Sequence, residues 1–244
     1  MIGDSHSKPG VSNARYGWLG NLIADVGADV VVDIGDWWDM ESLSSYDKGK
    51  KSFEGRRYKK DIEAGVEAQE RLSLKLVRHG IAPRLIRTEG NHEARIAKVG
   101  QLNPELDGLI SNKDLESEEY GWEFYPFLTP VEVNGIVYCH YFTSGIMGRP
   151  ISGEHPAYSL LQRKSQSCVS GHSHILDYCT RNDALGNRRS AVVAGCYFAH
   201  EEKWAGPQVN KIWDRGIVVL REVKDGEFDF QWINIKAIEK KYKD

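Results

Sequence analysis

Apolar and polar residues along this chain follow two different periods. Apolar residues recur every three or four positions over 13–26 and over 57–79, which predicts two helices that each bury one face. Apolar runs at 30–34 and 84–88 are too short for helices and predict buried strands. Because helix and strand patterns follow one another from the start, the first half of the chain is typical of an α/β fold.

Strand patterns dominate the second half of the chain. Alternating apolar residues flank Asn134-Gly135, which is the signature of a type I′ β-hairpin. A helix is expected at 156–164 and a short strand at 167–170. From 175 to 235 we expect strands separated by turn residues, and no internal repeat is present.

Composition and charge narrow the class of protein without identifying a partner. With 244 residues, 41% hydrophobic and 27% charged, the chain is typical of a globular protein and is long enough for one large domain or two small ones. A net charge of −3 gives no overall attraction to nucleic acid and leaves only a local basic patch for such binding. The chain has no apolar run as long as a membrane span and no basic-then-apolar leader, so we expect no membrane partner. Four scattered cysteines without a CxxC pair indicate reduced, buried thiols and a cytoplasmic location: Cys139, Cys168, Cys179 and Cys196.

Polar side chains with metal-binding chemistry follow the ends of the predicted strands. The carboxyl ends of strands are where open α/β sheets bind ligands, so we expect these side chains to converge. They are Asp4 and His6, Asp36 and Asp39, Asn91, His92 and Glu93, His140, and His172 and His174. This set contains five of the eight histidines and no thiolate, which favours divalent transition metals.

The number of candidate ligands indicates two metal ions rather than one. A catalytic zinc takes about three protein ligands, whereas two metals about 4 Å apart need roughly this many and one carboxylate that spans both. Asp36 is the candidate for the spanning carboxylate. In Asp4-x-His6 and His172-x-His174, residues two apart on an extended segment point to the same side, so each pair would bind one site or straddle two.

These motifs, in their order, resemble the five motifs of the calcineurin-like metallophosphoesterases. They are Asp4-x-His6, Gly35-Asp36-x-x-Asp39, Gly90-Asn91-His92-Glu93, His140 and Gly171-His172-x-His174. The segment from His140 to His174 also resembles phosphoesterases encoded by tailed bacteriophages. The resemblance implies one domain over 1–244, a four-layer α/β/β/α sandwich with two mixed β-sheets, in which 175–235 supply mainly strands of the second sheet.

Carried over position by position, the resemblance implies a role for each residue. Asp4, His6 and His174 hold one metal, Asn91, His140 and His172 hold the other, and Asp36 bridges them. A hydroxide between the metals attacks phosphorus in line, His92 protonates the leaving oxygen, and Asp39 orients His92. Glu93 is expected to orient its neighbours from behind the site. Manganese is the expected metal, with iron, zinc, nickel or magnesium as alternatives.

Two departures from the family pattern affect these expectations. The family's first strand is almost absent ahead of Asp4, so Asp4 and His6 are expected on a mobile terminus. Met40 follows Asp39, where the protein Ser/Thr phosphatase branch carries an arginine that binds phosphate. The second departure weakens the interpretation as a protein phosphatase.

Two interpretations stay open for several residues near these motifs, one functional and one structural. Trp37 and Trp38 would stack on a nucleobase or belong to the core. The basic residues between 48 and 60 would guide a polyanion or form a solvated face. Arg149 would clamp a phosphate or remain without a role. His155 and His200 lie outside the motifs and are expected to be structural or on the surface.

The sequence therefore predicts a two-metal phosphoesterase, with a lean towards a phosphodiesterase or nuclease acting on nucleotides or nucleic acid. A phosphomonoesterase acting on a small molecule or a phosphoprotein is the alternative enzyme. A nucleic-acid-binding relative without catalysis is the alternative of another class. The natural substrate and the oligomeric state stay open.

Overall fold

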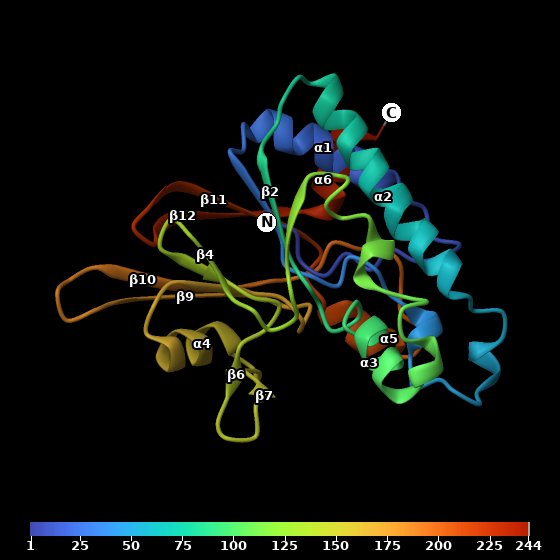
Figure 1. The fold of residues 1–244 in the computed structure, drawn as a ribbon. Helices are drawn as coiled ribbons and strands as arrows, with labels where there is room; N and C mark the ends of the chain where they lie inside the picture. The colour runs from blue at the N-terminus through green and yellow to red at the C-terminus, as the bar shows by residue number, and fades with distance from the viewer. Residues whose placement is uncertain (244) are drawn as a thin grey trace.

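Three parallel strands form the centre of the first sheet. The computed structural model describes residues 1–243 and is an α/β protein with several mixed sheets (Figure 1). The central strands lie in the order β1 (Val30–Asp33), β2 (Arg84–Thr88) and β3 (Trp122–Tyr125). Ile2 extends this sheet past β1, because it bridges Asp33 in parallel and Ile217 in antiparallel orientation.

The last two strands join this first sheet through Ile2. β11 (Gly216–Lys224) and β12 (Glu227–Asn234) form an antiparallel pair, and β11 carries Ile217. The expectation that 175–235 would supply mainly second-sheet strands is therefore wrong for β11 and β12. A bridge of one residue leaves no periodic pattern, so the sequence could not assign this hairpin to a sheet.

The second sheet contains five strands. Their order is β4 (Val131–Val133), β5 (Ile136–Tyr138), β8 (Cys168–Ser170), β10 (Arg188–Ala194) and β9 (Leu176–Asn182). The β4–β5 hairpin turns at Asn134 and Gly135, whose φ angles of 51° and 81° fit the predicted type I′ turn. β5, β8 and β10 are parallel, so their carboxyl ends share one edge of the sheet.

Helices cover the outer faces of both sheets, and an apolar core lies between the sheets (Figure 1). α1 (Ala14–Val26), α2 (Tyr58–Arg78) and α6 (Ile235–Tyr242) pack on the first sheet, and α4 (Pro156–Lys164) packs on the second. Val31 faces the helices and Val32 faces the second sheet, because successive strand residues point to opposite sides. The two sheets are thereby fixed face to face, with their strand ends at a common edge.

Several short elements carried no clear sequence signal. They are α3 (Arg95–Leu102), α5 (Gly206–Ile212), β6 (Thr143–Ser144), β7 (Arg149–Pro150) and the 3₁₀ turns η1 (Glu41–Leu43), η2 (Lys51–Phe53), η3 (Pro104–Leu106) and η4 (Asn112–Leu115). These elements have only two to eight residues, so each contains too few repeats for a period to be recognised. The parallel strand β3 was missed for the same reason.

The start of the chain is held firmly in the structure, contrary to the expected mobile terminus. Ile2 is 1% exposed, and both Asp4 and His6 are buried. The Met1 amine donates a hydrogen bond to the Val218 carbonyl, 2.8 Å away. Beyond Met1 the strands β1 and β11 separate, and a groove of about 440 Å³ lies between them, lined largely by apolar side chains of both strands and of α1.

Within residues 1–243 no helix combines the length and the apolar character that crossing a membrane requires. All four cysteines are free thiols. Cys139, Cys168 and Cys196 are buried as expected, and Cys179 is half-buried. The buried thiols pack against apolar neighbours.

Candidate metal centre

The loops after five strand-like segments bring the predicted ligands together at one edge of the two sheets. Asp4 and His6 follow the Ile2 bridge, and Asp36 follows β1. The remaining ligands follow the next strands: Asn91 after β2, His140 after β5, and His172 and His174 after β8. Five of these side chains are buried, and Asn91 and His172 are half-buried. A convergence of strand ends, predicted from the sequence, is thus present in the structure.

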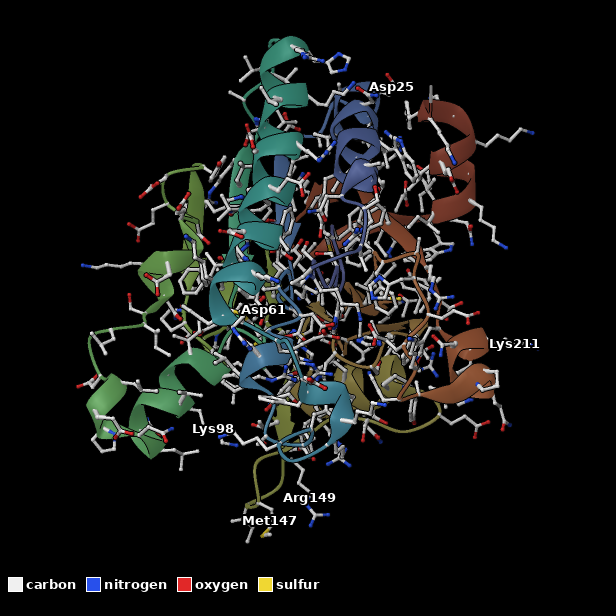
Figure 2. The ribbon with its side chains drawn as sticks, turned by 90° about the vertical axis from the view of Figure 1, so that its right-hand side faces the viewer. Asp25, Asp61, Lys98, Met147, Arg149 and Lys211 are labelled. Atoms are coloured by element: carbon white, nitrogen blue, oxygen red, sulfur yellow. The ribbon has the colours of Figure 1, made fainter. Side chains whose placement is uncertain are left out.

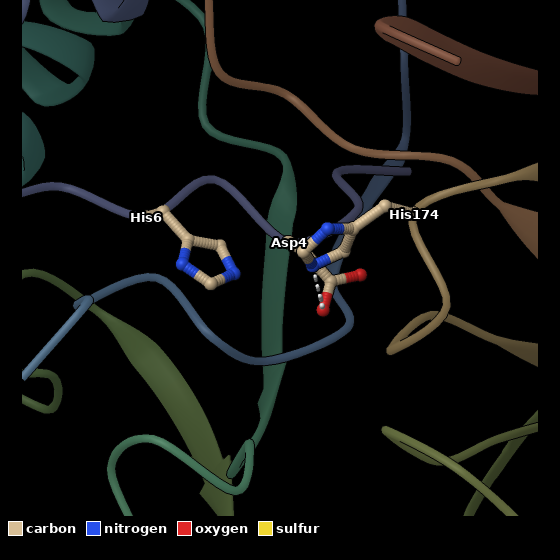
Figure 3. A group of neighbouring side chains, drawn as sticks. All are labelled: Asp4, His6 and His174. Carbon is tan, nitrogen blue, oxygen red and sulfur yellow. Dashed lines mark ion pairs between the residues drawn. The ribbon is translucent and has the colours of Figure 1, made fainter. Parts of the chain in front are cut away.

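The first group consists of Asp4, His6 and His174, whose ligand atoms all lie within 4.8 Å of one another. Figure 3 shows the three side chains turned towards one another, with 3.8 Å between His174 Nε2 and Asp4 Oδ1. His6 Nε2 is buried and has no hydrogen-bond partner among residues 1–243. A buried nitrogen without a partner is costly, and a cation held by these three residues would satisfy it.

The second group consists of Asp36, His140 and His172, which also meet within 4.8 Å. His140 Nδ1 lies 2.9 Å from the Ile34 carbonyl oxygen, so Nδ1 carries the proton and Nε2 presents a lone pair. That Nε2 lies 2.9 Å from Asn91 Oδ1 and 3.5 Å from Asp36 Oδ2. Three acceptor atoms that face one another fit a shared cation.

The Asp36 carboxylate belongs to the second group and also faces the first. Its Oδ2 is 3.8 Å from His6 Nε2, in the first group, and 3.5 Å from His140 Nε2, in the second. Its Oδ1 accepts a hydrogen bond from the His92 backbone N–H at 2.9 Å, which fixes the orientation of the carboxylate. This position suits a carboxylate shared by two cations.

Four of the seven candidate ligands have a left-handed backbone. The φ angles are 45° for His6, 56° for Asp36, 71° for His172 and 60° for His174. Residues other than glycine rarely adopt this region, at a cost of about 1–3 kcal/mol each, and such residues cluster where a site dictates side-chain direction. The backbone strain therefore marks the same residues as the sequence motifs.

Glu93 ties the loops that follow β1 and β2. Its Oε2 accepts hydrogen bonds from the backbone N–H groups of Asp36 and Gly90, both at 3.0 Å. Its Oε1 accepts one from Trp38 N–H at 2.8 Å. Gly90 is required here, since a Cβ at this position would lie 2.1 Å from Asp36 Oδ1. Glu93 thus holds the loop that carries Asp36, as the sequence led us to expect.

His92 also comes within 4.8 Å of His6 and Asp36, one residue from each group, and Asp39 lies beside it. His92 Nδ1 is 2.6 Å from the Asp39 carbonyl oxygen and 3.2 Å from Asp39 Oδ1. Arg95 Nη1 donates to the same carbonyl oxygen at 2.9 Å. Nδ1–H therefore points to Asp39, and His92 Nε2, 3.8 Å from Asp36 Oδ2, faces the predicted metal site.

Lys8, His200 and Glu202 extend the site and were missed by the sequence analysis. The Lys8 ammonium lies 3.3 Å from both Asp39 Oδ2 and Glu41 Oε1 and donates to Glu202 Oε1. His200 Nε2 lies 2.7 Å from the same Glu202 oxygen. Only the strand order could have indicated these residues. β10 runs parallel to β8, so the residues that follow β10 lie at the same edge of the sheet.

The pKa values of the histidines separate into two kinds. Burial lowers the pKa of His140 to about 4, and it also lowers the pKa of His172 and His174, which keeps these imidazoles neutral. Burial acts in the same direction on His92, but Asp36 and Asp39 outweigh it and raise the pKa of His92. Neutral imidazole is the form that binds metal, and a raised pKa suits a proton donor.

The carboxyl groups of the site also respond to burial and to one another. Burial and the neighbouring Asp36 raise the pKa of Asp4 well above its usual value. Burial would also raise the pKa of Asp36, but the imidazoles of His140, His92 and His6 reverse the direction and lower it. When two carboxyl groups share a buried site, the pKa of one rises while the other stays charged. Bound cations would favour the charged form of both.

Both tryptophans after β1 belong to the core, so the stacking interpretation is wrong. Trp37 and Trp38 are fully buried, and the Arg87 guanidinium lies 4.5 Å and 5.0 Å from the centres of their rings. Arg87 in turn contacts Asp33. The two buried tryptophans therefore anchor the loop that carries Asp36 to the core.

The two basic features considered for substrate binding lie on the surface. Figure 2 shows Arg149 and Met147 at the end of the β6–β7 hairpin, which projects from the molecule. In the segment 48–60, Arg56 pairs with Asp47 at 2.8 Å, while Lys51 and Arg57 are exposed. The exposed cations of this segment stay candidates for contact with a polyanion.

Comparisons with protein-family models, with curated proteins and with solved structures gave no match. The buried aspartate and histidine groups are therefore the basis for assigning chemistry to this chain, and they provide donors for metal ions.

Proposed function

We propose that this chain is a two-metal phosphoesterase with the four-layer sandwich of the calcineurin-like metallophosphoesterases. The observation that carries the proposal is that Asp36 Oδ2 lies 3.8 Å from His6 Nε2, in the Asp4–His6–His174 group, and 3.5 Å from His140 Nε2, which also meets Asn91. The order of layers supports it, with α1, α2 and α6 outside the first sheet and α4 outside the second. The order of the five sequence motifs supports it independently.

The two donor groups fit divalent transition metals. Each combines carboxylate or amide oxygen with imidazole nitrogen and contains no thiolate, which suits manganese and also iron, zinc or nickel. When bound, two such cations lower the pKa of water and neutralise charge on the phosphoryl oxygens. The residues themselves hold the cations, and the buried surroundings strengthen every charge interaction in the site.

His92 is the proposed donor of a proton to the leaving oxygen. Asp39 holds its Nδ1 side, so Nε2 is directed towards the place where an ester oxygen would depart. At 17% exposure, the His92 side chain is more accessible than the predicted ligands His6 and His140. General acids of this kind contribute about 10²–10⁴-fold to the rate.

Two substitutions test the proposal. Asp36→Asn is expected to lose manganese as well as hydrolysis of bis-p-nitrophenyl phosphate, because it removes the shared carboxylate. His92→Ala is expected to retain both ions and to lose about 10²-fold in rate on an alkyl ester, which needs protonation of its leaving group. His79→Ala, an exposed histidine at the end of α2, is the matched control. Weak metal binding by the wild type, with no effect of His92→Ala, would favour a nucleic-acid-binding relative without catalysis.

Within this function we favour phosphodiesters of nucleotides or nucleic acid over phosphomonoesters. Met40 occupies the position of the phosphate-binding arginine of protein phosphatases, and the exposed Lys51 and Arg57 would attract a polyanion. Burial of both tryptophans removes base stacking as a reason for this preference. Hydrolysis rates on bis-p-nitrophenyl phosphate and p-nitrophenyl phosphate with manganese distinguish diesterase from monoesterase activity. A strong preference for the monoester would overturn the preference for phosphodiesters.

A further inference from the structure

We propose that Lys8 is a positioning residue that aligns Asp39 for its contact with His92, an inference that rests on the phosphoesterase function proposed above. Lys8 belongs to none of the motifs, and its ammonium group lies among three carboxylates behind the site. Its side chain is 11% exposed, which is unusual for lysine.

The backbone places Lys8 directly beside Asp39. Ser7 N–H donates to the Trp37 carbonyl oxygen at 2.7 Å, and Asp39 N–H donates to the Ser7 carbonyl oxygen at 3.0 Å. The segment after Ile2 and the loop after β1 therefore run side by side as a short parallel pair. The position of Lys8 relative to Asp39 follows from these bonds and not only from attraction between charges.

Asp39 divides its two carboxylate oxygens between Lys8 and the histidines. Oδ2 faces the Lys8 ammonium at 3.3 Å, and Oδ1 lies 3.2 Å from His92 Nδ1, beside the Asp39 carbonyl oxygen, which is 2.6 Å from the same nitrogen. Oδ1 also lies 3.6 Å from His6 Nδ1, so a carboxylate without Lys8 has a second imidazole to turn towards. By holding Oδ2, Lys8 keeps Oδ1 at the edge of the His92 ring.

The other end of Lys8 is anchored by the loop that follows β10. Glu202 accepts the Lys8 hydrogen bond, and its second contact is His200 Nε2 at 2.7 Å. Glu202 N–H donates to Asn210 Oδ1 at 2.9 Å, and Asn210 Nδ2 donates to the Glu202 carbonyl oxygen at 2.8 Å. A continuous set of contacts thus connects α5 through Glu202 and Lys8 to Asp39 and His92.

The test compares Lys8→Met with Lys8→Arg on two diesters. A dinucleoside phosphate has an alkoxide leaving group that needs a proton, whereas bis-p-nitrophenyl phosphate has one that leaves without it. Lys8→Met is expected to lose about tenfold or more in kcat on the first and less than about threefold on the second, since His92 acts only on the first. Lys8→Arg should recover most of the loss, and manganese content should not change. Lys236→Met, an exposed lysine on α6, is the matched control.

A double variant separates positioning from general damage. In a His92→Ala background Lys8→Met should cost nothing further on the dinucleoside phosphate, because the group that Lys8 positions is gone. Glu202→Gln, which weakens the anchor and keeps the Lys8 charge, should reproduce a smaller loss with the same dependence on the leaving group. Equal losses on both diesters, or additive losses in the double variant, would overturn the role of Lys8 alone. A wild type inactive on both diesters would instead overturn the phosphoesterase function, and this role with it.

Discussion

Replacing Glu93 with glutamine tests whether one carboxylate holds the loop that presents Asp36. Glu93 is 1% exposed, and its two oxygens accept three backbone N–H groups. Glutamine keeps the shape but turns one oxygen into an NH₂ group. With its carbonyl oxygen towards Asp36 and Gly90, the amide would face the Trp38 N–H with a donor, so at least that hydrogen bond is lost.

The expected loss of stability follows from the loss of this hydrogen bond. A buried N–H that loses its partner costs about 1–3 kcal/mol, and Trp38 N–H loses its acceptor, so Glu93→Gln should lower the free energy of unfolding by about 2–3 kcal/mol. For a chain of 244 residues each kcal/mol corresponds to about 2 °C, which predicts a fall in Tm of about 4–6 °C. Because Trp38 belongs to the loop that carries Asp36, loss of this hydrogen bond should loosen the loop and lower manganese affinity by about 10–100-fold.

Scanning calorimetry of the manganese-loaded protein and titration calorimetry of manganese binding measure the two quantities. Glu63→Gln, an exposed glutamate on α2, should change Tm by no more than about 1 °C. The reasoning is refuted if Glu93→Gln also stays within about 1 °C and binds manganese within about twofold of the wild type.

Three further predictions concern protons and charge. Burial raises the pKa of Asp4, so manganese binding should release protons wherever Asp4 is still protonated, seen as a binding enthalpy that depends on the buffer; equal enthalpies in two buffers at every pH tested would contradict this. Burial raises the pKa of Glu93 from 4.5 to about 8, so in the metal-free protein its contribution to stability is complete below about pH 4.5 and lost as pH rises to about 8. The denaturant midpoint should therefore fall between about pH 4.5 and 8 in the wild type and fall less in Glu93→Gln. The same pH dependence of the midpoint in both proteins would contradict this prediction. Lys51→Gln with Arg57→Gln should slow hydrolysis of DNA or RNA about tenfold at low salt and leave bis-p-nitrophenyl phosphate unaffected; equal losses would exclude a guiding role.

The sequence was sufficient where a period or a turn motif persists over several residues. The helix predicted at 156–164 has these bounds in the structure, and the Asn134-Gly135 turn joins β4 to β5. The convergence of the ligands was predictable because parallel strands present their carboxyl ends at one edge. Motif residues adjacent to strand ends therefore needed no knowledge of distant contacts.

Contacts between distant segments could not be predicted in this way. Lys8 meets Glu202 across 194 positions, and only the order of strands in the second sheet brings the loop after β10 to this edge. The burial of Trp37 depends on Arg87, which lies over the ring from a different strand. Polar residues in irregular loops carry no period, so their partners become visible only in three dimensions.

The groove between β1 and β11 has a practical consequence for anyone who adds residues ahead of Met1. The amine of Met1 points towards Val218, so an added segment starts between two strand edges rather than in solvent. An affinity tag rich in glycine and charge would keep those edges apart, a few residues from Asp4. A leader of alternating valine and lysine would pair with both edges and extend the sheet at the start of β1, away from the metal centre. Tags for metal-binding measurements therefore belong at the other end of the polypeptide.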